Sequence, residues 1–284
     1  MQIDPTTIPQ SEVYKHIAFA VAPRPIAFAS TIDKVGNVNL SPFSFFNLFS
    51  SNPPVLIFSP VRSGRDGSTK HTLQNVLEVP EVSISIVNYA MVEQMSLAST
   101  AYAKGVNEFV KAGFTAAESS KIKAPFVTES PASFECVVDQ VIELGQEGGA
   151  GNLVVARVVN MHLRDEYLDE NGYLDTHKLD LVGRMGGSYY SRANNGLFEI
   201  PKPIRTQGIG VDQLPISVRN SSVLTGNNLG RLGNAESLPD ADLVEQMGRI
   251  YLSKSIEEIH QVAQQLLEQG QTEKALALLL SADR

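Results

Sequence analysis

Two long strand-like segments joined by a glycine-rich connection constrain this chain most, because together they predict an antiparallel β-hairpin. The segments are residues 133–144, "SFECVVDQVIEL", and residues 152–163, "NLVVARVVNMHL", with "GQEGGAG" between them. Both are rich in β-branched and other apolar residues, which favour strands. Glycines permit the positive φ angles that tight hairpin connections need. The fold must therefore accommodate two long neighbouring strands.

Shorter strand-like segments precede this hairpin and extend the pattern toward a barrel. They are residues 25–33, 38–42, 53–60 and 81–88. In "EVSISIVN" the residues alternate, so that Val82 and Ile84 face one side and Ser83 the other. About six strands at short spacing, with turn residues between them, are typical of a barrel. We expect a mainly β domain over residues 1–200, with peripheral helices where residues 91–120 become more helical.

The glycine-rich connection contains the start of a dinucleotide-binding fingerprint, in "GAGNLV". That fingerprint must follow a strand and open a helix. Here the glycines open a β-branched strand instead. A Rossmann-type nucleotide site is therefore not expected.

Composition limits the class of protein and its partners. The formal net charge of −8 argues against nucleic acid as a partner. The single cysteine, Cys136, excludes an intrachain disulfide, and its place in a strand pattern predicts burial. We see no leader segment and no run of about 20 apolar residues, so we expect a cytoplasmic protein without a membrane span. The five histidines are scattered without ligand spacing, and no metal site is expected.

Residues 59–75, "SPVRSGRDGSTKHTLQN", form a basic loop in this acidic chain. Against one acidic residue, Asp66, the loop carries Arg62, Arg65, Lys70 and His71. An apolar strand precedes it and a short helical pattern follows, which is how a chain builds an anion site at a helix N-terminus. The glycine spacing does not match a P-loop. We therefore expect a single terminal phosphate rather than a nucleoside triphosphate.

The amino-acid composition changes after residue 200, and we expect an irregular linker and a C-terminal helical extension over residues 201–284. Residues 201–240 are rich in Pro, Gly, Asn and Ser, which predicts an irregular connection. Ser255 and Glu258 form a capping-box pattern ahead of a one-sided apolar helix. That apolar side needs a partner surface, either the barrel or a second subunit.

Three separated segments together resemble one known family. They are "APRPIAFAST" at residues 22–31, "NLSPFSFFNLFSSNPP" at residues 39–54 and "GRMGGSYY" at residues 183–190. In this order they resemble the flavin reductase-like, FMN-binding split-barrel family, over roughly residues 10–200. The resemblance implies an FMN-binding split β-barrel and a homodimer in which each flavin lies near the interface.

The resemblance also implies which residues contact the cofactor. The segment at residues 41–47 would line the isoalloxazine ring and ribityl chain, and the basic loop would hold the phosphate. The cofactor-binding candidates are Arg24, Ser41, Ser44, Phe45, Asn47, Ser59, Arg62, Lys70, Thr72, Arg184 and Tyr189. Arg24 would contact the flavin or a neighbouring subunit, and a surface position is an equal alternative for it. At least one phenylalanine of the segment is expected to be core. The family often has Lys-Asp-Thr where this chain has Lys70-His71-Thr72, so the role of His71 stays open.

These expectations favour an FMN-binding flavoprotein oxidoreductase, of the NAD(P)H-dependent flavin reductase type. No catalytic residue is assigned, because the flavin carries the hydride chemistry. One alternative is an FMN-binding electron carrier or flavin store without turnover. Another is a reductase of a different acceptor, such as a metal complex or a monooxygenase partner. NADH or NADPH preference, and whether FMN is prosthetic group or substrate, stay open.

Overall fold

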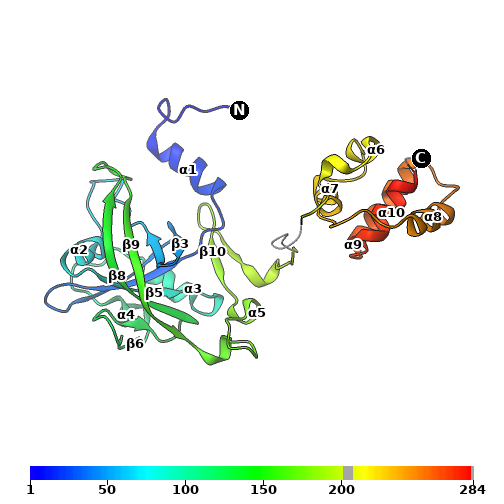
Figure 1. Cartoon of the computed structure of the whole chain (residues 1–284). Helices are drawn as coiled ribbons and strands as arrows, with labels where there is room; N and C mark the ends of the chain where they lie inside the picture. The colour runs from blue at the N-terminus through cyan, green and yellow to red at the C-terminus, as the bar shows by residue number, and fades with distance from the viewer. Residues whose placement is uncertain (201–206, 283–284) are drawn as a thin grey trace. The chain divides into compact units, whose positions relative to one another are not determined.

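The computed structural model describes residues 1–200 and 207–282. The chain divides into two compact units, Met1–Leu197 and Phe198–Arg284, which we call the barrel unit and the helical unit. In Figure 1 the barrel unit runs from blue to yellow-green and the helical unit from yellow to red. Each unit has a hydrophobic core of its own, which is the main requirement of a domain.

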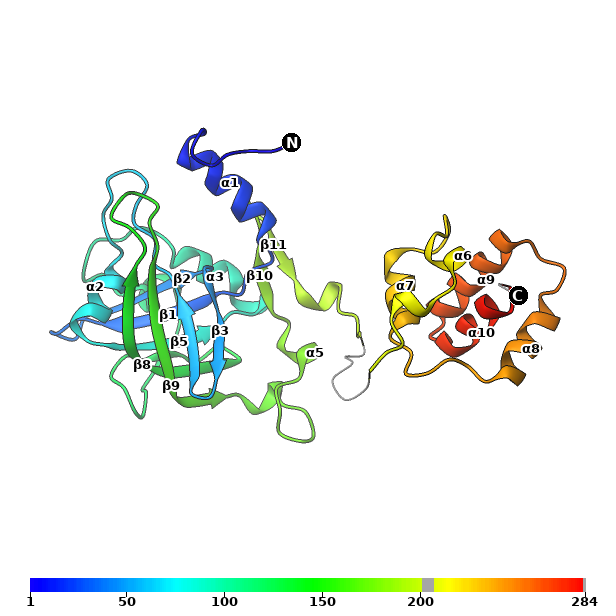
Figure 2. The same ribbon diagram turned by 45° about the horizontal axis from the view of Figure 1, so that its top comes forward.

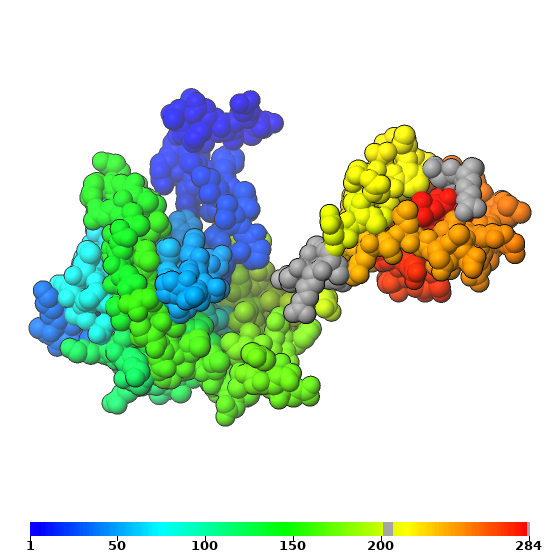
Figure 3. Space-filling view, in the orientation of Figure 1, coloured from blue at the N-terminus to red at the C-terminus, as the bar shows by residue number. Residues whose placement is uncertain are grey.

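One antiparallel sheet of seven strands forms the barrel unit and curves around its core (Figures 1 and 2). In sheet order the strands are β2 (Val38–Phe43), β1 (Ala27–Ile32), β5 (Glu81–Ile86), β8 (Ala132–Glu143), β9 (Asn152–Leu163), β4 (Pro54–Phe58) and β3 (Phe46–Ser51). The predicted hairpin is confirmed, because β8 and β9 pair antiparallel along their whole length. Figure 3 shows this hairpin in green, running across one face of the unit.

Helices and two small strand pairs complete the barrel unit. They are α1 (Gln10–Ala20), α2 (His71–Glu78), α3 (Val92–Leu97), α4 (Glu108–Ala112), α5 (Thr176–Leu179), β6 (Ala116–Ala117) with β7 (Phe126–Val127), and β10 (Val182–Arg184) with β11 (Tyr190–Arg192). Helix α2 packs on β1 and buries Leu73 and Val76 in the core. The predicted burial of Cys136 is confirmed, and burial raises the pKa of its thiol to about 12.

Strand β5 is buried on both faces, although a strand with alternating serines usually exposes one of them. Ser83 and Ser85 are as buried as Val82. The Ser85 hydroxyl lies 2.8 Å from the Ser133 hydroxyl and accepts a hydrogen bond from the Val127 N–H at 3.2 Å. Strand β7 therefore covers the serine face, where the Ser85 hydroxyl bonds to Ser133 and to the β7 backbone, whereas the buried Ser83 hydroxyl has no hydrogen-bond partner among the described residues.

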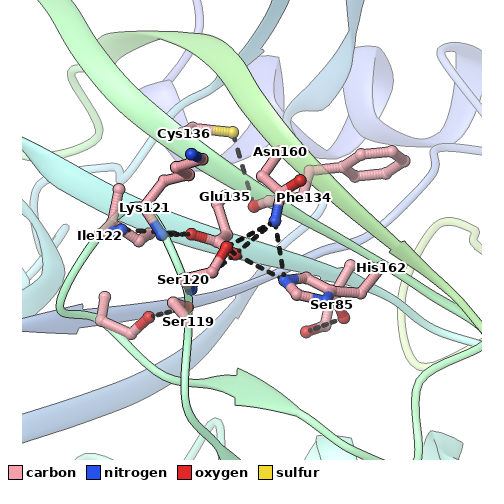
Figure 4. Close-up of polar contacts among 12 residues, drawn as sticks. Ser85, Ser119, Ser120, Lys121, Ile122, Phe134, Glu135, Cys136, Asn160 and His162 are labelled. Atoms are coloured by element: carbon pink, nitrogen blue, oxygen red, sulfur yellow. Dashed lines mark hydrogen bonds and ion pairs between the residues drawn. The ribbon is translucent and has the colours of Figure 1, made fainter.

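A buried carboxylate on β8 holds the segment between β6 and β7. Glu135 is fully buried and accepts hydrogen bonds from the N–H groups of Ser120, at 2.9 Å, and Lys121, at 2.6 Å (Figure 4). The side chains of Asn160 and His162 on β9 also bond to it, at 2.9 and 2.6 Å. Burial alone would raise the pKa of Glu135, but these hydrogen bonds outweigh burial and lower the pKa to about 2.

The helical unit packs several short helices around an apolar core. Its helices are α6 (Ile216–Arg219), α7 (Gly226–Gly233), α8 (Ala241–Ile250), α9 (Ile256–Glu268) and α10 (Thr272–Ala282). Leu232, Leu267 and Leu276 are among the buried side chains of this core. None of the helices that the structure describes is long and apolar enough to cross a membrane.

Helical structure begins earlier than the sequence predicted. Residues 201–240 were expected to be irregular, and α6 and α7 show that this is wrong for part of the range, while residues 201–206 lie outside the described residues. A reciprocal capping box between Thr225 and Asn228 begins α7. At Gly233 a Cβ would lie 2.9 Å from a backbone nitrogen. The glycine that suggested irregular structure instead permits close packing of this helix.

The apolar side of α9 is buried inside the helical unit. The predicted capping box between Ser255 and Glu258 is confirmed. Ile259 and Ala263 pack in the core with residues of α7, α8 and α10, whereas Ile256 stays 48% exposed. The partner surface that the sequence required therefore comes from neighbouring helices of the same unit.

Candidate functional site

The separated sequence segments of the predicted site lie against one another in the barrel unit. Arg24 and Arg184 form an antiparallel backbone bridge, with N–H to oxygen distances of 3.0 and 2.8 Å. The Ser59 N–H donates to the Phe45 oxygen at 2.8 Å. The Arg24 Nε donates to the Ser44 hydroxyl at 3.4 Å. Short contacts thus connect all four segments, at residues 22–31, 39–54, 59–75 and 183–190.

Arg24 is buried, so its alternative placement as a surface arginine is wrong. It is 7% exposed, and its Nη1 donates to the carbonyl oxygens of Ala18 and Val21, at 2.7 and 2.6 Å. Its Nη2 donates to the Met185 oxygen at 3.2 Å, and its guanidinium lies 5.9 Å from the centre of the Phe45 ring. The guanidinium therefore joins the C-terminus of α1, the β10–β11 hairpin and the turn between β2 and β3.

The segment at residues 41–47 contains a two-residue turn between two strands that are not paired with each other, since β2 and β3 are at opposite ends of the sheet order. Strand β2 ends at Phe43 and β3 begins at Phe46, so only Ser44 and Phe45 lie outside the sheet. Phe43 is core, as expected for at least one phenylalanine, and its ring centre lies 5.3 Å from that of Phe58. Phe45 is 39% exposed, so its ring can contact a ligand.

The remaining polar candidates of this segment lie within the strands. Ser41 is half-buried in β2. Asn47 is exposed in β3, opposite Ile57, and its Oδ1 accepts a hydrogen bond from the next backbone N–H at 2.8 Å. The two residues therefore flank the turn, while Ser44 belongs to it.

The basic loop is fixed to the β8–β9 hairpin, beside its tip (Figure 2). The Ser59 hydroxyl is buried and accepts from the Asn152 N–H at 3.0 Å, and the Asn152 amide donates to the Pro60 oxygen at 2.8 Å. The Arg62 N–H donates to the Ala150 oxygen at 2.9 Å. At Gly148 a Cβ would lie 2.9 Å from a loop carbonyl oxygen, so this close approach requires glycine.

Arg62 presents a buried donor without an acceptor. Its side chain is 14% exposed, and its two Nη groups bond to the Gly67 oxygen at 3.4 Å and to the Gln146 side chain at 3.0 Å. Its Nη2 also forms a longer ion pair with the more exposed Glu143 carboxylate, at 3.8 Å. The Nε is buried and has no hydrogen-bond partner among the described residues. Buried donors are normally paired, so an unpaired one marks a place where an external acceptor fits.

The N-terminus of α2 adds further free donors. Lys70 precedes the helix, its side chain is exposed, and no side chain caps the helix. The first N–H groups, of His71 and Thr72, make no hydrogen bond that we find among the described residues. The Thr72 hydroxyl points away from the loop, because it is 1% exposed and donates to the Asn39 side chain at 2.7 Å. Of Thr72, the backbone N–H is therefore the group available to a ligand.

The loop keeps its positive character although it contains Asp66. Hydrogen bonds from the Ser68 and Ser63 side chains lower the pKa of Asp66 to about 2, so it is ionised. Its Oδ1 accepts from the Ser68 N–H and hydroxyl, at 3.1 and 2.7 Å. Lys70 has no ion pair with a carboxylate among the described residues, and neither has Arg65, which lies in the exposed part of the loop, away from the helix. The positive charges of Lys70 and Arg62 therefore stay available at the N-terminus of α2. Together with the free donors of Arg62 and α2, these charges fit a phosphate group.

The other two candidates lie in the β10–β11 hairpin. The Arg184 Nη1 donates to the Tyr189 oxygen at 3.2 Å, and its guanidinium lies 4.8 Å from the centre of the Tyr190 ring. The Tyr189 side chain is 75% exposed. At Gly186 a Cβ would lie 2.4 Å from the Phe19 ring, which packs α1 onto this hairpin.

Sequence reasoning missed the asparagines that support the site. Asn152 fixes the start of the basic loop, and Asn39 connects Thr72 to the buried carboxylate of Glu108, at 3.0 Å. Asn152 directly follows the glycine-rich connection, and a polar residue at the start of a strand was the available signal. Asn39 gave none, because its partners lie far away in the sequence.

Comparison with known proteins agrees with this arrangement. A family model described as "Flavin reductase like domain" matches residues 19–180. An uncharacterized protein of Halalkalibacterium halodurans is 33% identical over 209 residues, which are 73% of this chain and 99% of that protein. An uncharacterized protein of Aquifex aeolicus is 36% identical over 181 residues, which are 64% of this chain and 90% of that protein.

Solved structures extend the comparison to the fold. Nitrilotriacetate monooxygenase component B from Bacillus cereus is 28% identical with a TM-score of 0.66, over 70% of this chain and 98% of that one. The 2-nitrobenzoate 2-nitroreductase of Pseudomonas fluorescens is 25% identical with a TM-score of 0.63, over 74% and 100%. The predicted flavin reductase split-barrel fold, with a helical C-terminal region, is confirmed. The chain belongs to the flavin reductase-like family, whose members bind flavin.

Proposed function

We propose that the protein is an FMN-binding oxidoreductase that accepts hydride from NAD(P)H and passes the electrons to free flavin. The main support for FMN, rather than a flavin without a phosphate, is the group of unpaired hydrogen-bond donors in the basic loop. The buried Arg62 Nε has no partner among the described residues, and the N-terminus of α2 beside Lys70 is uncapped. FMN differs from riboflavin by one phosphate, which such donors bind well.

The chain's own residues would bind and orient this cofactor. Bound FMN would supply a two-electron acceptor for hydride from the nicotinamide ring. Arg62, Lys70 and the N–H groups of α2 would hold the phosphate. The half-exposed ring of Phe45 offers an apolar contact, and the Ser44 hydroxyl offers a hydrogen bond to the edge of the ring system.

Absorbance spectroscopy of the purified protein tests the proposal first. We expect a flavin spectrum, in the isolated protein or after FMN is added, that bleaches when NADH or NADPH is added without oxygen. No flavin binding at micromolar concentrations would contradict the proposal.

The phosphate assignment has its own test in Lys70→Ala. Charged hydrogen bonds contribute about 1.5–3 kcal/mol, so FMN affinity should fall about 10- to 100-fold. Riboflavin affinity should not change, because riboflavin has no phosphate. Arg65→Ala, which removes the same charge from the exposed part of the same loop, is the matched control. Equal losses for FMN and riboflavin would place the phosphate elsewhere.

A second candidate function uses the reduced flavin on another acceptor. The similarity to a monooxygenase component and to a 2-nitroreductase favours it, since these names describe different uses of electrons. NADH oxidation with and without added free flavin separates the two. Turnover that depends on free flavin supports a flavin reductase, and turnover with a nitroaromatic acceptor alone supports the second candidate. Flavin bleaching without any turnover would indicate an electron carrier or flavin store.

We also propose that the protein is a homodimer. Large apolar side chains on the edge strand β3 are exposed, with Leu48 at 61% and Phe49 at 63%. Exposed apolar groups on an edge strand are unfavourable in a monomer. Light scattering of the full chain should give twice the chain mass of 30.8 kDa, and Leu48→Asp should shift it toward the monomer.

A further inference from the structure

Two arginines in the barrel unit face each other across a backbone bridge. Arg24 and Arg184 are direct antiparallel partners, which places their side chains on the same face. Like charges directly opposite each other are destabilising. Among the residues that the structure describes, neither guanidinium forms an ion pair with a carboxylate. The chain has 31 acidic residues against 23 basic ones, so carboxylates are not scarce.

Backbone carbonyl groups at the end of α1 compensate the positive charge of Arg24. Its Nη1 donates to the Ala18 and Val21 oxygens, at the C-terminal end of α1, where the helix dipole is negative. Its other donors bond to Met185 and Ser44. Arg24 is therefore internally satisfied, although its positive charge still acts on its neighbours.

The guanidinium of Arg184, in contrast, lacks hydrogen-bond acceptors for most of its donors. The Tyr189 oxygen is the single hydrogen-bond partner of the Arg184 guanidinium among the described residues, and the Tyr190 ring lies beneath that guanidinium. The residue is partly exposed, which leaves most of its five N–H donors free for a ligand.

Arg192, in the same hairpin, shows the contrasting arrangement. Its guanidinium forms two short hydrogen bonds to the Asp180 carboxylate, at 2.8 and 2.7 Å, and lies over the Tyr89 ring. The pair raises the pKa of Arg192 and lowers that of Asp180. The end of α5 thus supplies a carboxylate, Asp180, to one arginine of the hairpin, whereas the other arginine has none among the described residues.

We propose that Arg184, stacked on Tyr190 and backed by the charge of Arg24, binds a phosphate group of the nicotinamide dinucleotide. This inference rests on the proposed function, in which the phosphate of FMN occupies the basic loop. FMN has one phosphate, so a second cationic site serves another molecule. A dinucleotide carries a pyrophosphate and an adenine, and the guanidinium and the exposed ring of Tyr189 match these two groups.

The test compares two hydride donors that differ in phosphate. NADH carries the pyrophosphate, whereas N-benzyl-1,4-dihydronicotinamide has the same reactive ring without any phosphate. In Arg184→Gln, the NADH concentration that half-saturates anaerobic flavin reduction should rise about 10- to 100-fold. The rate with the benzyl compound and the affinity for FMN should not change.

A direct binding measurement removes the dependence on turnover. Calorimetric titration of ADP-ribose, which has the pyrophosphate and adenine but no nicotinamide, should show the same loss in Arg184→Gln. Arg184→Lys should retain part of the affinity, since it keeps the charge but not the planar donors. Arg192→Gln is the matched control, because it removes an equal charge from the same hairpin and should leave ADP-ribose binding unchanged.

The outcomes separate the inference from the proposed function. Equal losses for NADH and the benzyl compound, or no loss for either, would overturn the inference. Loss of FMN affinity in Arg184→Gln would make Arg184 a flavin-binding residue, and weaker binding of 2-nitrobenzoate with unchanged ADP-ribose would assign it to an acceptor carboxylate. Both results would also overturn the inference. A wild-type protein that binds no flavin contradicts the proposed function instead, and the ADP-ribose titration is still decisive for Arg184.

Discussion

The barrel unit and the helical unit differ in what they bury. In the barrel unit, Arg24, Glu108 and Glu135 are all buried, together with many serine, threonine and asparagine side chains. In the described part of the helical unit, His260 is the single buried polar side chain, and leucines dominate the core. Buried polar groups cost free energy unless they are paired, so a fold that keeps many of them uses them to hold specific segments in place.

The comparisons with relatives follow the same division. The family model lies entirely in the barrel unit, at residues 19–180. Two solved relatives align over almost their whole length, yet they cover 70% and 74% of this chain, so between a quarter and a third of this chain has no counterpart in them. The polar interior thus belongs to the part that the family shares.

The largest effect is expected from removing the buried carboxylate of Glu135. In Glu135→Ala, the N–H groups of Ser120 and Lys121 lose their acceptor, and His162 loses its partner. A buried donor left without its acceptor costs about 1–3 kcal/mol, and Glu135 is the acceptor for more than one such donor. Chemical denaturation of the full chain should show this loss in the transition of the barrel unit and leave that of the helical unit unchanged. A loss below about 1 kcal/mol would show that the network is not needed for stability.

A core truncation in the helical unit should instead lower the stability of that unit and leave the barrel unit unchanged. Leu267 is fully buried, and Leu→Ala in such a core costs about 2–5 kcal/mol. Leu267→Ala should lower the melting transition of the helical unit and leave FMN binding and the barrel transition unaltered. If both transitions shift together, the two units unfold as one, and their difference in composition does not correspond to separate stability.

Much of this division could be predicted from the sequence. The long hairpin, the helix after the basic loop and the capping box at Ser255 and Glu258 follow from local patterns, which side-chain periodicity and end signals reveal. Helix α7 could not be predicted from such patterns, because its glycines reduce helix propensity. One of them, Gly233, instead allows close packing against a backbone segment that is distant in sequence.

Local patterns also could not predict the supporting contacts of the site. The segments around Ser44, Ser59 and Arg184 were identified individually, but the role of Arg24 in connecting them depends on carbonyl oxygens from α1 and the β10–β11 hairpin. Carbonyl groups are present at every residue, so sequence carries no signal for such contacts. The inward direction of the Thr72 hydroxyl likewise depends on Asn39, which is distant in sequence.

Acid should affect the two units in different pH ranges. The Ser221 hydroxyl accepts from the N–H groups of Val223 and Leu224, so its own hydrogen is donated to the Nδ1 of His260. Burial lowers the pKa of His260 from 6.5. The unfolded state therefore binds the proton more readily, and this contribution to stability is present above pH 6.5 and falls as the pH drops below it.

Glu135 affects the stability of the barrel unit at lower pH, because its pKa in the folded state is lowered from 4.5 to about 2. Its contribution is present above pH 4.5 and is lost as the pH falls toward 2. Calorimetry from pH 7.5 to 3 should thus show the helical unit weakening first. His260→Gln should remove most of the pH dependence of that transition between pH 7.5 and 5.5. An unchanged dependence would mean that other groups of the helical unit take up the protons.

The smallest effect is expected at the turn between β2 and β3, where the polar interior of the barrel unit meets the surface. Ser44 accepts a long hydrogen bond of 3.4 Å from Arg24, so Ser44→Ala should cost under about 1 kcal/mol of stability. Asn47→Ala, three residues away, removes an exposed amide bonded to its own neighbour and tests the other polar candidate beside the turn. If the turn borders the flavin ring, Ser44→Ala should shift the flavin absorbance or slow its anaerobic reduction at equal occupancy, with the barrel transition almost unchanged. An unaltered spectrum and rate in both variants would place the ring elsewhere, and Ser44 would then matter only as a partner of Arg24.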